Sequence, residues 1–296
     1  MIMSIKNTLS GTGVAIITPF KKNESIDFEA LGKVIDFIIE GGVNYIVSLG
    51  TTGETPVFDL DEKKEILNYT FEKVNNRVPI VVGVGGNNTK AVINEIHQLP
   101  IEKATAVLSA SPNYNKPTQE GIFLHYKSIA ESSPKPIILY NVPGRTGKNV
   151  SSQTITKLAN EVENIKGIKE ATDSMQQCME ILRDRPNDFL IVSGDDALSC
   201  AQIALGMDGV ISVAANCFPS QFSKMVTFAR ENNFTEARKI QLQLLKGYDY
   251  LFAENNPAGV KAFLYELGLI ENQLRLPLTP VSNSLQENIK SFIKNL

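Results

Sequence analysis

A lysine at the end of an apolar run is the residue of this chain best suited to covalent chemistry. Lys169 closes the run Ile165–Lys169 and is followed by Glu170. If the run is a strand inside a barrel, its amine lies in a dry environment, and burial disfavours the charged ammonium form. A neutral amine can attack a carbonyl carbon and form a Schiff base. The alternative is a lysine that extends from the strand end to solvent, and the local sequence leaves both open.

A turn rich in glycine and hydroxyl groups is a second candidate. The segment from Gly50 to Glu54 contains Thr51 and Thr52 and follows the apolar run Tyr45–Leu49. Glycine lets a backbone approach a ligand closely, and successive N–H groups can hold an anion. The turn therefore predicts a site for a carboxylate, and a plain tight turn with solvated threonines is the alternative.

Two tyrosines and an arginine lie close behind other apolar runs. Tyr140 ends one run, and Arg145 stands two residues after Pro143. A tyrosine hydroxyl can relay a proton, and the planar fork of arginine fits a carboxylate. Tyr114 lies in a rigid, proline-rich segment, residues 111–117, which can cap a site or contact another subunit. The alternatives are a core tyrosine, a surface arginine and a locally packed Tyr114.

Metal and cofactor chemistry find no support in the sequence. His97 and His125 lie in helix-like stretches without carboxylates at ligand spacing, so we expect no metal site. The glycines between Gly83 and Gly86 lack the Gly-x-Gly-x-x-Gly pattern, and we expect no cofactor. The three cysteines have no Cys-x-x-Cys spacing, which favours free thiols in a reducing compartment.

Charge and hydropathy exclude several classes of binding partner. The net charge is −3 and no basic block is present, which weighs against nucleic acid. No stretch approaches the roughly 20 apolar residues needed to cross a bilayer. The segment from Met1 to Ser10 has no apolar run long enough for a signal peptide. We therefore expect a cytoplasmic protein that acts on small molecules.

Eight short apolar runs must position the candidate side chains. They are Val14–Thr18, Tyr45–Leu49, Ile80–Val84, Ala106–Ser109, Ile137–Tyr140, Ile165–Lys169, Leu190–Ser193 and Val210–Val213. Most are apolar throughout, as in parallel strands that are buried on both faces. Amphipathic stretches alternate with them, which favours a closed (β/α)8 TIM barrel over an open sheet. The active site of such a barrel lies in the loops after the strands.

Two helix starts are marked by capping residues. Asp27 can cap a helix that begins at Phe28, and Gly41 can end it. Asp59 and Glu62 have the spacing of a capping box.

The strand pattern stops after Val213, and the rest of the chain reads as helical. We predict a catalytic barrel over residues 1–218 and a C-terminal helical extension over residues 219–296. The extension is expected to pack on the barrel or on a partner subunit.

Five motifs of the chain occur in the order and spacing of the pyruvate-dependent class I aldolases. The chain therefore resembles this superfamily, which includes N-acetylneuraminate lyase. The motifs are Gly50-Thr51-Thr52-Gly53-Glu54, Tyr140-Asn141-Val142-Pro143, Gly167-Ile168-Lys169-Glu170-Ala171, Ser193-Gly194-Asp195-Asp196 and Gly209-Val210-Ile211-Ser212. The resemblance covers nearly the whole chain, from Gly13 to the region of Leu269.

The resemblance implies a role for each matching residue in the reaction. Lys169 would form the imine with pyruvate, and Tyr140 would pass protons to and from it. Thr52 and Tyr114 would complete a proton relay to water. Tyr114 resembles the residue that this family donates from a neighbouring subunit, which requires at least a dimer and implies a homotetramer built from dimers.

The resemblance also implies how substrate is held. Backbone amides of Thr51 and Thr52 would bind the pyruvate carboxylate. Gly194 and Ile211 would line the pocket through main-chain contacts.

Arg145 separates the members of the superfamily. An arginine two residues after the proline resembles the 4-hydroxy-tetrahydrodipicolinate synthase family, in which it would hold the carboxylate of aspartate 4-semialdehyde. That resemblance implies condensation of pyruvate with the semialdehyde in lysine and diaminopimelate synthesis. The alternatives are another pyruvate-dependent aldolase acting on a sugar acid, like N-acetylneuraminate lyase, and an inactive keto-acid sensor. The intact set of reactive residues argues against the sensor.

The sequence departs from the family at a regulatory site. Members inhibited by lysine carry histidine, glutamate and tyrosine at a site between subunits. The matching positions here hold Leu60, Lys63, Ala91 and Asn113, and only Asn87 agrees. We predict weak or absent inhibition by lysine.

Overall fold

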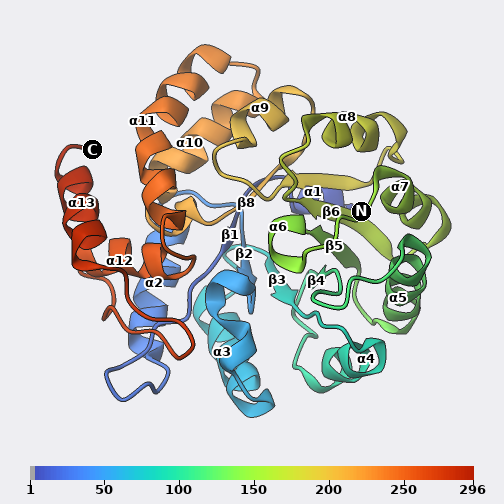
Figure 1. Cartoon of the computed structure of the whole chain (residues 1–296), viewed down its shortest axis with the longest axis horizontal. Helices are drawn as coiled ribbons and strands as arrows, with labels where there is room; N and C mark the ends of the chain where they lie inside the picture. Colours follow the sequence, from blue (N-terminus) through green and yellow to red (C-terminus); the bar gives the residue numbers. More distant parts are fainter. Residues whose placement is uncertain (1–3) are drawn as a thin grey trace.

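The computed structural model describes residues 4–296, and its centre is a closed barrel of eight parallel strands (Figure 1). The strands are β1 Gly11–Ala15, β2 Tyr45–Ser48, β3 Ile80–Gly83, β4 Ala106–Ala110, β5 Ile137–Asn141, β6 Ile165–Glu170, β7 Leu190–Ser193 and β8 Gly209–Ser212. Each strand pairs with the next along the chain, and β8 closes the barrel on β1. The predicted (β/α)8 fold is confirmed.

The first strand corrects a predicted boundary. The apolar run predicted Val14–Thr18, whereas β1 begins at Gly11 and ends at Ala15. Glycine gives no apolar signal, but close packing requires it here, because a Cβ on Gly13 would lie 2.2 Å from Cζ of Tyr45. Small residues that let neighbouring groups approach are invisible to a search for apolar runs.

Helices surround the barrel, and their starts follow the capping rules (Figure 1). Asp27 caps α2 (Phe28–Glu40) by accepting from the N–H of Ala30, and Asp59 and Glu62 form the reciprocal capping box of α3 (Leu60–Val74). The remaining helices of the ring are α4 Thr89–Gln98, α5 Gln119–Ser132, α7 Ser152–Glu161, α8 Met175–Asp184, α9 Ser199–Ala204 and α10 Pro219–Arg230. Short elements are α1 Ile5–Thr8, α6 Pro143–Thr146, η1 Thr51–Gly53, η2 Thr55–Val57 and η3 Ala214–Asn216.

Buried apolar side chains form two clusters, one between strands and helices and one inside the barrel. The inner cluster includes Tyr45, Val47 and Val192, with Leu9 next to α1. Filling the interior in this way makes the barrel a rigid frame for the loops at the ends of its strands.

Three further helices follow α10: α11 Phe234–Phe252, α12 Ala258–Glu266 and α13 Asn283–Lys294. They contact one another and lie together on one side of the barrel (Figure 1). Phe263 joins them by packing edge to face on Phe218 and Phe292, with ring centroids 5.2 and 6.1 Å away. The division at residue 218 stays a prediction, because α10 contacts both the barrel strand β1 and helix α11.

None of the helices in residues 4–296 is long and apolar enough to span a bilayer. Within the same residues, no group of three or more His, Cys, Asp or Glu side chains is arranged to hold a metal ion.

Candidate active site

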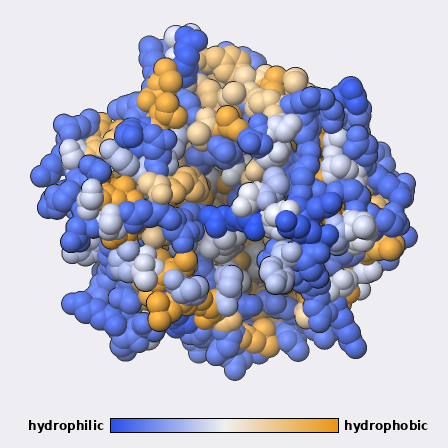
Figure 2. Space-filling view, in the orientation of Figure 1, coloured by the Kyte–Doolittle hydropathy of each residue, from blue (hydrophilic) through white to orange (hydrophobic). Residues whose placement is uncertain are grey.

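A cavity of ≈ 900 Å³ opens among the loops that follow the strands. Figure 2 shows the molecule in the orientation of Figure 1, with hydrophilic side chains spread over the centre of this face. Six of the residues predicted for the site line the cavity: Thr51, Thr52, Tyr140, Arg145, Lys169 and Gly194.

Lys169 and Tyr140 face each other across neighbouring strands. They are partners in the register of β5 and β6, and Nζ of Lys169 lies 4.5 Å from the ring centroid of Tyr140. Lys169 is 4% exposed, so the alternative of a lysine reaching solvent is wrong. No carboxylate in the described part of the chain forms an ion pair with it. A buried lysine without a counter-ion is suited to attack a carbonyl carbon.

The glycine-rich turn places two threonines at the cavity wall. Thr51 and Thr52 begin η1, where N–H groups have no acceptor within the helical turn and can bind an anion. Thr52 is buried, and its Oγ1 accepts a hydrogen bond of 3.1 Å from Nδ2 of Asn256. The hydroxyl of Thr52 therefore has a fixed orientation.

Arg145 stands on the short helix α6, directly after β5. Its Nη2 lies 3.5 Å from the backbone carbonyl of Asn256, and no carboxylate among residues 4–296 pairs with it. The guanidinium is thus a free cation on the cavity wall, where it can take a carboxylate of a ligand.

Gly194 provides room beside the reactive lysine. A Cβ at this position would lie 3.0 Å from Cε of Lys169 and 2.6 Å from Cβ of Ala171. Any larger residue would therefore push the lysine side chain out of place.

Two predicted site residues are not brought to the cavity of this single chain. Ile211 belongs to the inner apolar cluster of the barrel. Tyr114 is 90% exposed, with φ 61°, and does not line the cavity. Their roles stay predictions.

The sequence analysis missed the contribution of the C-terminal extension. Asn256, between α11 and α12, lines the cavity and contacts both Thr52 and Arg145. Tyr248 and Phe252 of α11 also line it. No strand precedes these residues, so a search of strand ends could not find them. The neighbouring Pro257 was the only signal, and it marks a loop rather than a site.

Two buried carboxyl groups support the loops of the site. Asp196 accepts from the N–H groups of Val213 and Ala214, at 3.1 and 2.8 Å, and burial raises its pKa to about 6. Glu170 accepts from the side chains of Asn141 and Gln177, and burial raises its pKa to about 7. Neither residue lies at hydrogen-bond distance from the other, so they form no acid–base pair.

A (β/α)8 barrel with a buried, unpaired lysine beside a tyrosine at the ends of its strands defines a class: the enzymes of the Schiff-base-forming, class I aldolase type. The family model of the dihydrodipicolinate synthetase family matches residues 8–296, and the chain belongs to that family.

Individual relatives are similar to this chain over nearly their whole length. The 4-hydroxy-tetrahydrodipicolinate synthase of Flavobacterium psychrophilum is 45% identical over 286 residues, which cover 97% of this chain and 98% of that protein. The crystal structure of dihydrodipicolinate synthase from Thermotoga maritima has a TM-score of 0.94 at 38% identity, covering 97% of this chain and 98% of that one. The chloride-inhibited enzyme from Acinetobacter baumannii, complexed with pyruvate, has the same TM-score, 0.94, and identity, 38%, over 97% and 99% of the chains.

Proposed function

We propose that this chain condenses pyruvate with L-aspartate 4-semialdehyde to give 4-hydroxy-tetrahydrodipicolinate, in lysine and diaminopimelate synthesis. The observation that carries the proposal is the placement of Lys169, beside Tyr140, in the same cavity as the free guanidinium of Arg145. The names of the relatives support it, and the complex of the Acinetobacter enzyme shows that one of them binds pyruvate.

The first step is formation of an imine. The amine of Lys169 attacks the ketone carbon of pyruvate, and the ketone oxygen leaves as water. The backbone N–H groups of Thr51 and Thr52 hold the pyruvate carboxylate meanwhile, because they stand at the start of a helical turn. Tyr140, whose ring lies against the amine, delivers the proton that the departing oxygen needs.

The second step forms the carbon–carbon bond. The protonated imine draws electrons, so a methyl proton of bound pyruvate can be removed and an enamine forms. The enamine carbon attacks the aldehyde carbon of the semialdehyde, and the aldehyde oxygen takes a proton. The relay of Tyr140, Thr52 and Tyr114 carries these protons to and from water. The amino group of the second substrate then replaces Lys169 at the former ketone carbon, which closes the ring and frees the lysine.

Arg145 favours this reaction over the sugar-acid alternative. Aspartate 4-semialdehyde carries a carboxylate at the end remote from its aldehyde, and a guanidinium without a protein counter-ion matches that group. A sugar aldehyde has hydroxyl groups there and offers no carboxylate to the guanidinium.

Tyr114 supports an assembly of several copies. We infer that its exposed ring enters the site of a neighbouring subunit and that the enzyme is a homotetramer built from dimers. The three cysteines are all unpaired, which supports the cytoplasm as its location.

Covalent trapping tests the proposal. Borohydride reduction in the presence of pyruvate is expected to fix a pyruvate-derived adduct on Lys169, located by peptide mass spectrometry. Lys169→Ala should give no adduct. Turnover of pyruvate is then followed with aspartate 4-semialdehyde and, in parallel, with sugar aldehydes. Absence of the adduct would refute the Schiff-base mechanism, and turnover with sugar aldehydes alone would refute the assignment of the second substrate.

A further inference from the structure

The turn that bears Thr51 and Thr52 ends in a residue with an unfavourable backbone conformation. The N–H groups of Gly53 and Glu54 close the turn on the carbonyls of Gly50 and Thr51, at 3.0 and 3.1 Å. Glu54 has φ 60°, in the left-handed region, which is costly for a residue with a Cβ and persists only where surrounding contacts hold it. Glu54 does not line the cavity, so its side chain is free to provide those contacts.

The side chain of Glu54 is fully buried against the C-terminal extension. Its Oε1 lies 2.5 Å from Nζ of Lys261, and both side chains are 0% exposed. Its Oε2 accepts from the backbone N–H of Arg275 at 3.2 Å. Lys261 also donates to the carbonyl of Gln273 and lies over the ring of Phe20, which fixes the position of its ammonium group.

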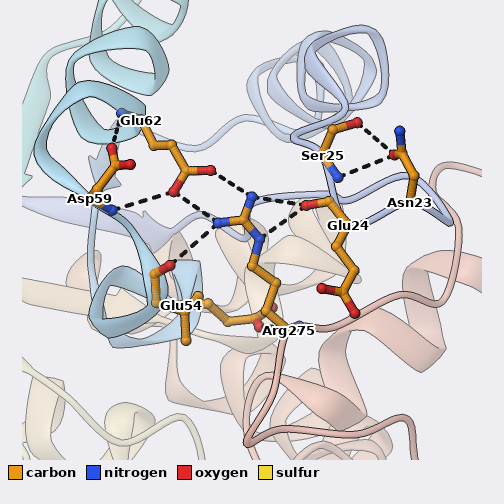
Figure 3. Close-up of polar contacts among 8 residues, drawn as sticks. Asn23, Glu24, Ser25, Glu54, Asp59, Glu62 and Arg275 are labelled. Atoms are coloured by element: carbon orange, nitrogen blue, oxygen red, sulfur yellow. Dashed lines mark hydrogen bonds and ion pairs between the residues drawn. The ribbon is translucent and has the colours of Figure 1, made fainter.

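The side chain of Arg275 anchors the same segment to the start of α3. Figure 3 shows its guanidinium between Glu62 and Glu24. The two terminal nitrogens lie 2.9 and 2.6 Å from the carboxylate of Glu62, and the fork also donates to the carbonyl of Glu24. These contacts belong to the side chain of Arg275, whereas Glu54 is held by its backbone N–H.

We propose that Glu54, through its buried pair with Lys261, is a positioning residue that sets the placement of the Thr51 and Thr52 amides for the pyruvate carboxylate. The inference deepens the proposed function and rests on it. The carboxylate of Glu54 cannot touch substrate, because it lies behind the turn. Its effect on the reaction passes through the turn and falls on pyruvate, not on the second substrate.

The rival explanation is that the buried pair only stabilises the fold. Removing one member of a buried ion pair leaves the other charge without a partner, which lowers stability whatever the pair does for the site. Binding and stability must therefore be measured separately, in variants that affect them differently.

The experiment uses the full-length protein and four variants: Glu54→Gln, Lys261→Met, the double variant of both, and Arg275→Met. The last removes the contacts to Glu62 but keeps the backbone N–H that holds Glu54, so it is the matched control. For each protein we would measure the melting temperature and the pyruvate concentration that half-saturates borohydride trapping on Lys169. Trapping needs no second substrate, so the result does not depend on the identity of the aldehyde.

Glu54→Gln is expected to raise the half-saturating concentration of pyruvate at least about tenfold, the effect of losing a hydrogen bond to a charged group. Its melting temperature should fall. The double variant should regain melting temperature, because no lone charge is left buried, but not the affinity for pyruvate. Arg275→Met should lower the melting temperature with pyruvate saturation changed less than about twofold.

Two results would overturn the inference. One is unchanged pyruvate saturation in a folded Glu54→Gln protein. The other is saturation that recovers together with the melting temperature in the double variant, which would show a role in stability alone. A wild-type protein that forms no adduct with pyruvate would instead refute the proposed function, and with it the ligand assigned to the turn.

Discussion

At the scale of single residues, the site combines two basic side chains that have no protein counter-ion. Lys169 contacts the ring of Tyr140, and within residues 4–296 the guanidinium of Arg145 has the backbone carbonyl of Asn256 as its one polar contact. Both face one cavity. An amine without a counter-ion is suited to attack a carbonyl carbon, and a guanidinium without one can take the carboxylate of a ligand. Two substrates that each carry a carboxylate fit this arrangement.

Arg145→Ala should separate the two substrates. Loss of the charged fork is expected to raise the KM for aspartate 4-semialdehyde by about a hundredfold, since paired charge-assisted hydrogen bonds are lost. Pyruvate saturation of borohydride trapping should stay within about twofold, because Thr51 and Thr52 are untouched. Steady-state kinetics with both substrates varied would measure this. Arg145→Lys, which keeps the charge without the fork, is the control. Its KM for the semialdehyde should lie between the values of the wild type and of Arg145→Ala. An unchanged KM would favour the sugar-acid alternative.

The site residues that could be predicted from the sequence are those at the ends of strands. Lys169 and Tyr140 could be found from sequence because each ends an apolar run, and barrel geometry brings strand ends together. Asn256 and Lys261 could not, since they meet Thr52 and Glu54 only through folding of a distant helical segment. The rigid, proline-rich segment made Tyr114 a candidate, but its role in a neighbouring subunit came from the family resemblance, and in the single chain the side chain is 90% exposed.

At the scale of elements, β5 and β6 together carry the reactive pair. Tyr140 lies opposite Lys169, and the next residues, Asn141 and Glu170, also lie opposite each other. Nδ2 of Asn141 donates to both carboxylate oxygens of Glu170, at 2.8 and 3.1 Å. Thr172 adds a backbone N–H at 2.9 Å. These contacts join the two strands where the chemistry takes place.

The buried carboxyl group of Glu170 predicts a dependence of stability on pH. Burial raises its pKa from 4.5 to about 7, so the folded protein holds the proton more tightly than the unfolded chain. The resulting stabilisation is complete below pH 4.5 and is lost as the pH rises through 7. Relative to Glu170→Gln, wild-type protein should lose up to about 1.4 kcal/mol of unfolding free energy per pH unit over this interval.

Urea denaturation of both proteins at several pH values between 4.5 and 7.5 would measure the difference. The substitution also changes the unfolding free energy by an amount that does not depend on pH, because an amide replaces one acceptor. Only the slope of the difference against pH tests the prediction. A difference that does not change with pH would show that folding does not raise the pKa of Glu170.

Element boundaries were less predictable than element types. Leu190–Ser193 was predicted with its observed ends, because Asn187 and Asp188 before it and Gly194 after it interrupt the apolar pattern. The start of β1 was missed because Gly11 and Gly13 give no apolar signal, although a Cβ on either would collide with Asn44 or Tyr45. Tertiary packing thus decided what the local pattern could not.

At the scale of the whole molecule, the exposed side chain of Tyr114 supports the proposal that a site is completed by a second copy. Mixing inactive variants tests this. Lys169→Ala and Tyr114→Phe subunits are each expected to be nearly inactive. If Tyr114 acts across an interface, each mixed dimer holds one intact site, and subunits exchanged in equal amounts should regain about one quarter of wild-type activity.

Activity before and after subunit exchange by dilution and reconcentration would show the gain. The control mixes Lys169→Ala with Lys169→Arg, which can create no intact site. If the first mixture regains no more activity than the control, Tyr114 does not act in a partner's site.

Regulation is predicted to differ from that of lysine-inhibited relatives. Lys63 pairs with Glu95 at 2.8 Å, and Asn113 bonds with Asn87, so these groups already satisfy one another. Ala91 offers no acceptor. With few groups left to contact lysine, we expect its dissociation constant to lie above about 1 mM. L-Lysine at about 1 mM should therefore leave turnover unchanged. Half-inhibition at lower concentrations would contradict the prediction, and isothermal titration would show whether lysine binds at all.

The contacts between the catalytic turn and the C-terminal extension have a consequence for synthesis of the chain. Thr52 and Glu54 are made early, whereas their partners Asn256 and Arg275 follow 204 and 221 residues later. Strands of the barrel can pair while the chain is still on the ribosome. The turn that we propose as the pyruvate site acquires its final shape only when the last part of the sequence has emerged. We therefore expect an unfinished chain to neither bind nor consume pyruvate.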